Sequence, residues 1–193
     1  MKKCLSLAFI LFISAAAAQN LNIVKIAKYQ PLIYRDATGK YEGCGIRTTF
    51  LTSIPMPTHT GDFSVTIFKE RDGRVTGITK MAFSFIPNIN NFNKVKNLAL
   101  TSYSMANANG KRIRLDDPKA GKEQNSQQAA TSPIEAVNFI NDIASGKPVQ
   151  VGIRLQGEKN LNIFSIEGKD PLSQPEQSQI ASCISQVFPS NTK

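Results

Sequence analysis

Apolar and polar residues alternate over much of the first 115 positions, with the period of two that is typical of strands half-buried in a sheet. In residues 62–71, for example, Phe63, Val65 and Ile67 occupy every second position, with hydroxyl side chains between them. The same alternation, bounded by turn residues, predicts strands in six further segments. These are residues 22–28, 31–35, 44–54, 98–108, 149–155 and 161–166.

A hairpin is predicted where Asp72-Gly73 follows the first of these strands, because this dipeptide suits a two-residue type I′ turn. Pairing across such a turn places Arg71 directly opposite Arg74. In that register the aromatic stripe of the second strand faces away from Ile78, which lies earlier on the same strand. We therefore expect a bulge near Lys80 or a strand that is buried on both faces.

Asn109-Gly110 marks a second hairpin, with residues 111–115 as its return strand. The apolar residues of that strand share one face, and Arg112 and Arg114 share the other. This hairpin should therefore have an apolar inner face and a cationic outer face.

Two amphipathic helices are predicted in the C-terminal half. Each begins with a capping box, Ser132-Pro133-Ile134-Glu135 for the first and Ser173-Gln174-Pro175-Glu176 for the second. Apolar residues then recur at helical spacing. Gly146 ends the first predicted helix, and Pro189 ends the second. The stripe of the second helix includes Cys183, which we expect to point inward.

Residues 116–131 are polar and lack aromatic and β-branched apolar residues, so we expect a long mobile loop there. Elsewhere hairpins dominate and the helices come late, whereas a doubly wound sheet would alternate strands and helices throughout. We therefore predict an α+β fold, with a mostly antiparallel sheet or sandwich built from hairpins and two amphipathic helices in the C-terminal half.

The first 18 residues have the three-part composition of a cleaved secretory signal. Two lysines precede an apolar run over residues 4–13, and small residues follow, with Ala16 and Ala18 where a signal peptidase requires them. The run is shorter than the roughly 20 apolar residues that span a bilayer. We predict a bacterial Sec-type signal peptide over residues 1–18 and one globular domain over residues 19–193. This domain would be exported to the periplasm or medium without a transmembrane segment; an uncleaved anchor is the alternative.

Removal of the signal leaves Cys44 and Cys183 as the two cysteines of the chain. Because an oxidising compartment favours disulfides, we expect these two to pair and to join the early strands to the last helix. The alternatives are two buried free thiols, or a reactive cysteine with His59 as its base.

Loss of residues 1–18 also removes two of the 23 basic residues and none of the 14 acidic ones, so the formal charge becomes +7. Five basic residues gather in the two hairpins: Arg71, Arg74, Lys111, Arg112 and Arg114. We regard them as candidate contacts for an envelope polyanion or a protein partner, with simple solubility as the alternative. Nucleic acid is not favoured, because the chain has no Trp and most of its strand aromatics fall on predicted core faces.

No motif for a nucleophile, a phosphate loop or a metal site is evident in the sequence. His59 is the only histidine, and we place it in a loop between two strands. Glu42 and Glu167 are the carboxylates that turns and helix caps explain least. We therefore predict a non-catalytic exported binding module without a cofactor or metal. The alternative is a small envelope hydrolase that uses His59 with a carboxylate or hydroxyl.

Overall fold

A computed structural model describes residues 21–24, 26–52, 58–87, 94–123, 125–168 and 171–188. Two sheets and two helices make up this part of the chain. The seven-stranded sheet contains, in order, β2 (Ile26–Arg35), β3 (Tyr41–Leu51), β4 (Thr58–Lys69), β5 (Val75–Ile86), β9 (Ser126–Thr131) and β8 (Asp116–Ala120), with β6 (Lys96–Asn97) paired to β5. The four-stranded sheet contains β1 (Leu21–Val24), β11 (Asn162–Ile166), β10 (Val149–Leu155) and β7 (Leu100–Ala106). The helices are α1 (Pro133–Ala144) and α2 (Gln174–Val187).

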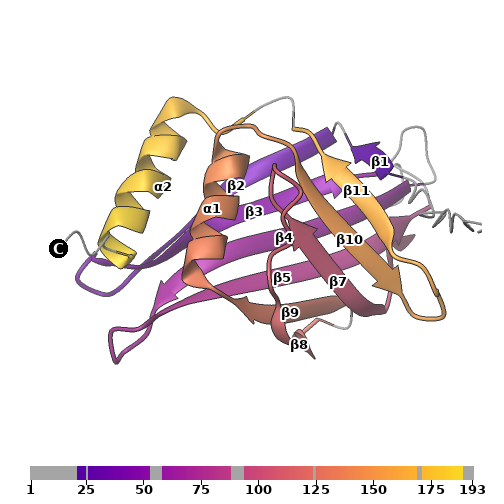
Figure 1. The fold of residues 1–193 in the computed structure, drawn as a ribbon, viewed down its shortest axis with the longest axis horizontal. Helices are drawn as coiled ribbons and strands as arrows, with labels where there is room; N and C mark the ends of the chain where they lie inside the picture. The colour runs from indigo at the N-terminus through magenta and orange to yellow at the C-terminus, as the bar shows by residue number, and fades with distance from the viewer. Residues whose placement is uncertain are drawn as a thin grey trace, which may run out of the picture.

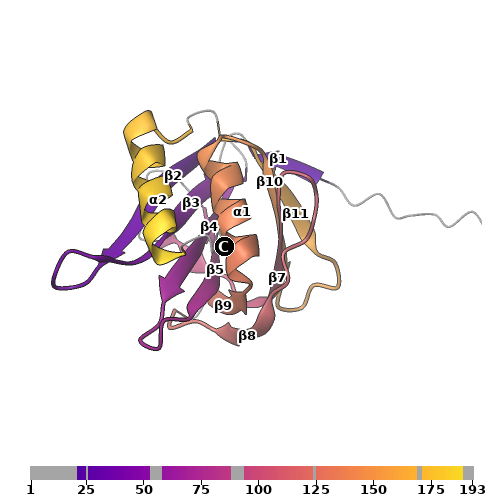
Figure 2. The same ribbon diagram turned by 60° about the vertical axis from the view of Figure 1, so that its left-hand side comes forward.

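The molecule has two layers. One layer is the large sheet, and the other consists of α1, α2 and the small sheet, which all lie against the same face of the large sheet (Figures 1 and 2). Among the described strands, every pairing is antiparallel except that of β1 with β11. The prediction of an α+β fold dominated by antiparallel strands is therefore confirmed.

The core lies between these two layers and contains a chain of five buried phenylalanines. Phe164 of β11 contacts Phe50 and Phe83 of the large sheet, with 5.9 Å between ring centroids in each pair. Phe63 of β4 meets Phe139 of α1 edge-on at 6.1 Å. Because a fully buried Phe stabilises a fold by about 1.5–3 kcal/mol, these contacts hold both the small sheet and α1 on the large sheet.

The first hairpin differs from its prediction by one residue. The backbone N–H of Glu70 donates to the carbonyl of Arg74, so three residues form the loop, and Gly73 takes the positive φ of 86°. Ile67 then pairs with Gly77, and Arg71 does not face Arg74. Since a one-residue shift exchanges the two faces of a strand, the aromatic stripe of β5 points into the core and Ile78 points outward. The predicted bulge near Lys80 is wrong, because the pairing of β4 with β5 is continuous.

The second hairpin also closes with a three-residue loop. Asn107 N–H donates to the carbonyl of Lys111, and Gly110 has a positive φ of 74°. On the return segment only Arg112 forms a bridge, to Ala106, so the predicted strand over residues 111–115 is reduced to this bridge. Ile113 is nevertheless buried, and the neighbouring arginines are exposed.

Residues 116–131 were expected to form a long loop, but they contain regular strands. They contain β8 and β9, and β9 pairs with β5 over six residue pairs. The polar composition of this segment wrongly predicted a loop. Ser126 and Ala129 are small enough to be buried beside β5, while Gln128 between them faces solvent. Tertiary pairing thus overrides a low strand propensity.

The two helix starts differ in their capping. At α2, Glu176 accepts hydrogen bonds from the backbone N–H of Ser173 at 2.8 Å and from its hydroxyl at 2.7 Å. At α1, the Ser132 side chain makes no capping bond. Instead, the Glu135 carboxylate accepts a 3.4 Å hydrogen bond from the backbone N–H of Arg114. The capping box predicted for the first helix is therefore wrong.

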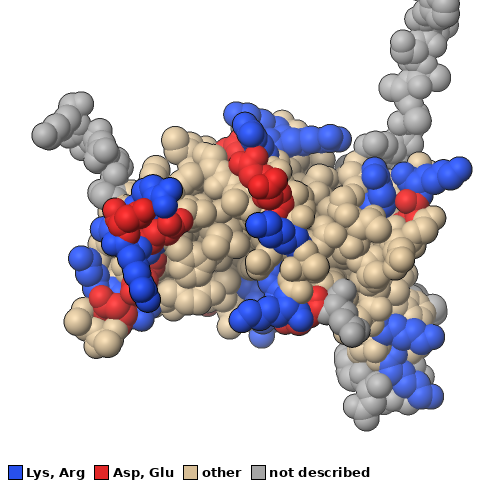
Figure 3. All heavy atoms as spheres, turned by 90° about the horizontal axis from the view of Figure 1, so that it is seen from below, with Lys and Arg blue, Asp and Glu red and all other residues tan. Residues whose placement is uncertain are grey.

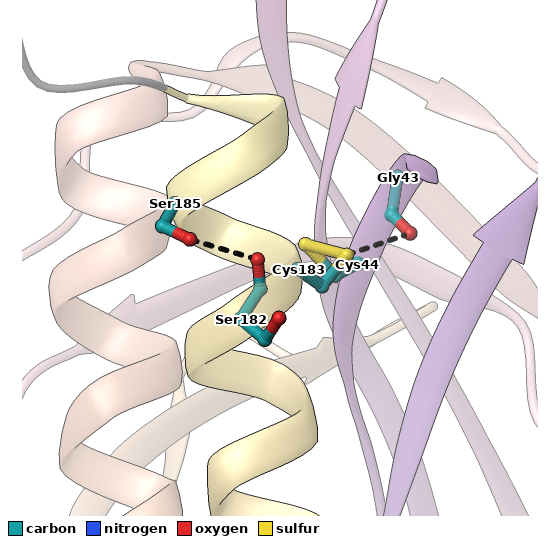
Figure 4. The surroundings of a disulfide bond; sticks show 5 residues. All are labelled: Gly43, Cys44, Ser182, Cys183 and Ser185. Carbon is teal, nitrogen blue, oxygen red and sulfur yellow. Dashed lines mark hydrogen bonds between the residues drawn. A yellow bond between two sulfur atoms is a disulfide. The ribbon is translucent and has the colours of Figure 1, made fainter. Parts of the chain in front are cut away.

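Cys44 of β3 and Cys183 of α2 lie at disulfide distance, with their Cα atoms 6.1 Å apart (Figure 4). Both residues are completely buried, and the Gly43 carbonyl oxygen lies 3.4 Å from the Cys183 sulfur. The pair connects the C-terminal helix to the second strand of the large sheet. The predicted signal peptide lies outside the described residues, and no helix within them is long and apolar enough to cross a bilayer.

Candidate functional site

The outer face of the large sheet, which neither helix covers, carries a polar hollow of about 510 Å³. Its floor consists of outward side chains from three consecutive strands: Arg47, Thr60, Asp62, Ser64, Lys80 and Ala82. Leu32 and Tyr34 of β2 line it on one side. The opposite side of the hollow, near β6 and the connection between β8 and β9, is lined by Ser84, Asn97, Glu123 and Asn125.

Strand register sets the floor of this hollow. Arg47, Ser64 and Lys80 occupy directly opposed positions on β3, β4 and β5, and Gln128 continues the row on β9. Neighbouring strands lie about 4.8 Å apart, so Arg47 and Lys80 are roughly 10 Å apart at their Cα atoms, with the Ser64 hydroxyl between them. The row thus combines two cations with a hydroxyl group on one surface.

Asp62 fixes the position of Arg47. The Nε atom of Arg47 donates to both carboxylate oxygens of Asp62, at 2.8 and 3.1 Å, and the Thr49 hydroxyl donates to the same carboxylate at 3.0 Å. The Arg47 side chain is 53% exposed, whereas that of Asp62 is 28% exposed. Because Nε alone makes these bonds, the terminal guanidinium nitrogens of Arg47 have no hydrogen-bond partner among the described residues.

The opposite side of the hollow is held by an amide and a second ion pair. Asn125 is buried, and its Nδ2 donates to the Ser84 hydroxyl at 2.9 Å and to the Phe83 carbonyl at 3.2 Å. The Ser84 hydroxyl in turn donates to Asn97 Oδ1 at 3.2 Å. Lys80 Nζ lies 3.2 Å from a carboxylate oxygen of Glu123. Both cations of the hollow thus have an acidic partner.

An aromatic pair forms the β2 end of the hollow. Tyr34 is 40% exposed, and its ring lies 4.8 Å from that of Phe68 on the same face of the sheet. Gly43 makes this contact possible, because a Cβ atom there would overlap the Phe68 ring. The Gly43-Cys44-Gly45 sequence is therefore a strand segment whose glycines leave space on the outer face while Cys44 points toward α2.

Two hydroxyls in the hollow are available to a ligand. Within the described parts of the chain, the side-chain hydroxyls of Ser64 and Thr60 make no hydrogen bond to another protein group, and both residues are partly exposed. Each can donate one hydrogen bond and accept others. Together with Arg47 and Asn97, these groups offer donors and acceptors to one bound molecule.

The predicted basic residues lie elsewhere, in the two hairpin turns. Arg74 bonds to Asp72 at 2.6 Å and to Glu70 at 3.4 Å, and Arg114 bonds to Asp116 at 2.8 Å. On the side of the molecule where β8 and β9 lie, basic side chains stand beside acidic ones and form no continuous basic surface (Figure 3). Among the described residues, no ion pair or hydrogen bond connects the basic residues of one turn with those of the other.

Arg71, Lys111 and Arg112 are exposed and have no acidic partner within the described ranges. Arg112 also borders a small depression on the small sheet, beside Gln150. Of the predicted cluster, these three side chains are therefore the ones with an unpaired charge.

His59 lies within β4 and not in a loop, which corrects the prediction. Its ring stacks on that of Phe83, with 5.3 Å between centroids and planes 4° apart, and also contacts Phe85. Burial against these rings lowers the pKa of His59 below its usual 6.5, and the Glu158 charge partly opposes this. Glu42 lies at the other end of β3, roughly 30 Å away by strand length, so the fold does not bring these two together.

The chain has no match among known protein families, curated proteins or solved structures. Within the described ranges no group of three or more His, Cys, Asp or Glu side chains could hold a metal ion. The sequence contains a partial sign of the hollow but not the strand register that brings its residues together. Polar residues alternate at Arg47 and Thr49, at Asp62 and Ser64, and at Lys80, on three strands that follow one another in the sequence.

Proposed function

We propose that this protein is an exported, non-catalytic binding module whose ligand lies in the polar hollow of the large sheet. The observation that carries the proposal is the fixed arrangement of exposed polar groups around Arg47 and Asp62. An ordinary solvated sheet face carries mobile, independent side chains. Here Arg47 and Thr49 are already hydrogen-bonded to Asp62, so little conformational entropy of these side chains is lost when a ligand binds.

Export is part of the proposal and has two supports. The first 18 residues have the composition of a cleaved signal. Cys44 and Cys183 lie at disulfide distance in the core, and such pairs persist in oxidising compartments.

The test is an NMR titration of the protein comprising residues 19–193 with small polar compounds. Glucose, N-acetylglucosamine, glycine, glutamate and inorganic phosphate would each be added to ¹⁵N-labelled protein. We expect at least one compound to shift the backbone amides around Arg47, Ser64 and Lys80, and Ser64→Tyr, which fills the floor of the hollow, to abolish the shift. If no compound shifts these amides, or if every shift lies elsewhere, the proposal is wrong.

A second candidate is binding of an envelope polyanion through Lys111 and Arg112. These exposed side chains have no acidic partner among the described residues, which leaves their charges available. Lys111→Glu combined with Arg112→Glu should then abolish association with lipopolysaccharide vesicles and leave the melting temperature unchanged. Unaltered association would eliminate this candidate.

A further inference from the structure

We infer that the ligand of the hollow is a neutral oligosaccharide, held by hydrogen bonds around Arg47 and Asp62 and by stacking on Tyr34. This inference rests on the proposed function and names its ligand class. Three features of the hollow carry it: its balanced charge, its length, and the combination of a polar floor with an aromatic ring at one end.

The charge of the hollow favours a neutral ligand. Arg47 is paired with Asp62, and Lys80 is paired with Glu123. An anionic ligand at Arg47 or Lys80 would lie beside the partner carboxylate, and a cationic ligand at Asp62 or Glu123 would lie beside the partner cation, so either ion would be repelled as well as attracted. A ligand that brings hydroxyl groups can bond to the free edges of both ion pairs without breaking either of them.

The length of the hollow favours a chain over a single ring. Tyr34 pairs with Gly43 at one end of β3, and Thr60 pairs with Leu51 at the other end. Eight residues separate these positions on β3, which corresponds to about 26 Å of strand. A ligand that contacts both ends must therefore be an extended oligomer.

The chemistry of the polar groups matches adjacent hydroxyls of a sugar. The guanidinium of Arg47 has unused donors directly beside the Asp62 carboxylate, which has acceptor positions left. A sugar ring presents neighbouring hydroxyls that can each donate and accept. One such hydroxyl can accept from Arg47 while its neighbour donates to Asp62, and the Ser64 hydroxyl lies next to both.

Tyr34 supplies the apolar part of the recognition. The C–H groups on one face of a sugar ring are apolar, and an exposed aromatic ring buries them by stacking. The Phe68 ring packs against Tyr34, with 4.8 Å between ring centroids, and Gly43 leaves the space that the Phe68 ring occupies. A peptide would instead pair through its backbone at a sheet edge, whereas the hollow offers side chains on a sheet face.

The experiment is calorimetric and NMR titration of residues 19–193 with tetrasaccharides of glucose and of N-acetylglucosamine. A tetraglycine peptide, tetraglutamate and inorganic phosphate serve as comparison probes. We expect a tetrasaccharide to bind and to shift the amides around Arg47, Asp62 and Tyr34. Since the ligand is neutral, the affinity should change less than twofold between 50 and 500 mM NaCl, whereas binding of a polyanion would weaken more than tenfold.

Variants separate stacking from hydrogen bonding. Tyr34→Ala should weaken tetrasaccharide binding about tenfold or more, and Tyr34→Phe should restore most of it. Asp62→Asn should weaken binding by a similar factor, and Glu70→Gln, an exposed carboxylate change outside the hollow, should have no effect. Thermal melting of each variant verifies that the fold is intact.

The outcomes distinguish the two proposals. If the peptide, tetraglutamate or phosphate shifts the amides of the hollow and neither tetrasaccharide does, the saccharide inference is wrong and the binding module stands. If no probe shifts these amides, both are wrong. Saccharide binding that Tyr34→Ala and Asp62→Asn leave unchanged would also overturn the inference.

Discussion

The hydroxyl of Tyr103 in the small sheet lies 2.6 Å from the hydroxyl of Thr79 in the large sheet. Both residues are buried, so this hydrogen bond joins the two sheets inside the core. The Tyr103 hydroxyl also lies 3.2 Å from the Thr79 carbonyl, and the Thr79 hydroxyl lies 3.3 Å from that of Ala129. The polar atoms at this point of the core are therefore satisfied by one another.

Replacing Tyr103 with Phe should lower the free energy of unfolding by about 1–2 kcal/mol, because the Thr79 hydroxyl loses its closest partner. Urea denaturation at pH 7 measures this difference. Tyr34→Phe is the matched control, since Tyr34 is exposed, and it should leave the free energy of unfolding unchanged within about 0.5 kcal/mol. Equal losses in the two variants would contradict a special role for Tyr103.

The same tyrosine predicts a loss of stability at high pH. Burial raises the pKa of Tyr103 to about 12, against the ordinary value of 10. Between these values the unfolded chain releases the proton and the folded chain keeps it, so stability declines as the pH rises from 10 to 12. In Tyr103→Phe this part of the decline should disappear, which denaturation curves at pH 9, 10 and 11 would reveal.

His59 predicts a second dependence on pH, of opposite sense. Its folded-state pKa lies below 6.5 because the ring is buried against Phe83 and Phe85. Below pH 6.5 the unfolded chain takes up the proton first, so the contribution of His59 to stability is present above pH 6.5 and is lost as the pH falls through the folded pKa. Stability should therefore decrease between pH 7.5 and 5.5, and His59→Phe should decrease less. NMR titration of the one imidazole gives the pKa directly, and a value above 6.5 would refute this reading.

Gly61 is required by the packing of β4. It faces the core, and a Cβ atom there would overlap the ring of Phe50. Gly61→Ala should therefore destabilise the fold by about 1–3 kcal/mol. Combining it with Phe50→Leu, which shortens the opposing side chain, should cost less than the sum of the two single changes. Additive costs in this double-mutant cycle would show that the two sites do not touch.

The cysteine pair predicts a large effect of reduction. A bond between Cys44 and Cys183 closes a loop with a sequence separation of 139 residues, and the chain-entropy model gives such a loop about 4–5 kcal/mol of stabilisation. Reduction, or replacement of both cysteines by Ala, should lower the melting temperature strongly. Because both sulfurs are buried in the folded protein, the labelling is done after unfolding without a reducing agent. Free thiols and a reactive cysteine are rejected if neither sulfur is then labelled. Labelling of both sulfurs would instead reject the disulfide.

Sequence pattern was sufficient for the class of fold and insufficient for register. Asp72-Gly73 indicated a turn correctly, yet it could not distinguish a two-residue from a three-residue loop, and that single residue decides which face of β5 is buried. Residues 116–131 show the converse case. Their composition is polar, but β5 offers unpaired backbone groups at the sheet edge, and pairing with β9 satisfies them.

The candidate site depended on information that the sequence does not state. Basic residues close together in the sequence, such as Lys111 and Arg112, were easy to notice. The hollow combines Tyr34, Arg47 and Asn125 from strands and turns far apart in the chain, and only the strand order brings them together. Side chains on one sheet face become neighbours through register, which single-sequence patterns leave undetermined.

The parallel pairing of the first strand determines when this protein can finish folding. Leu21 of β1 pairs with Ile163 of β11, and β2 begins the other sheet immediately afterwards. Contacts between residues so far apart in the sequence form slowly, because a long loop must be closed first. The small sheet can therefore be completed only after nearly the whole chain has been synthesised. A chain that is still being synthesised therefore cannot complete the small sheet until β11, at residues 162–166, has been made.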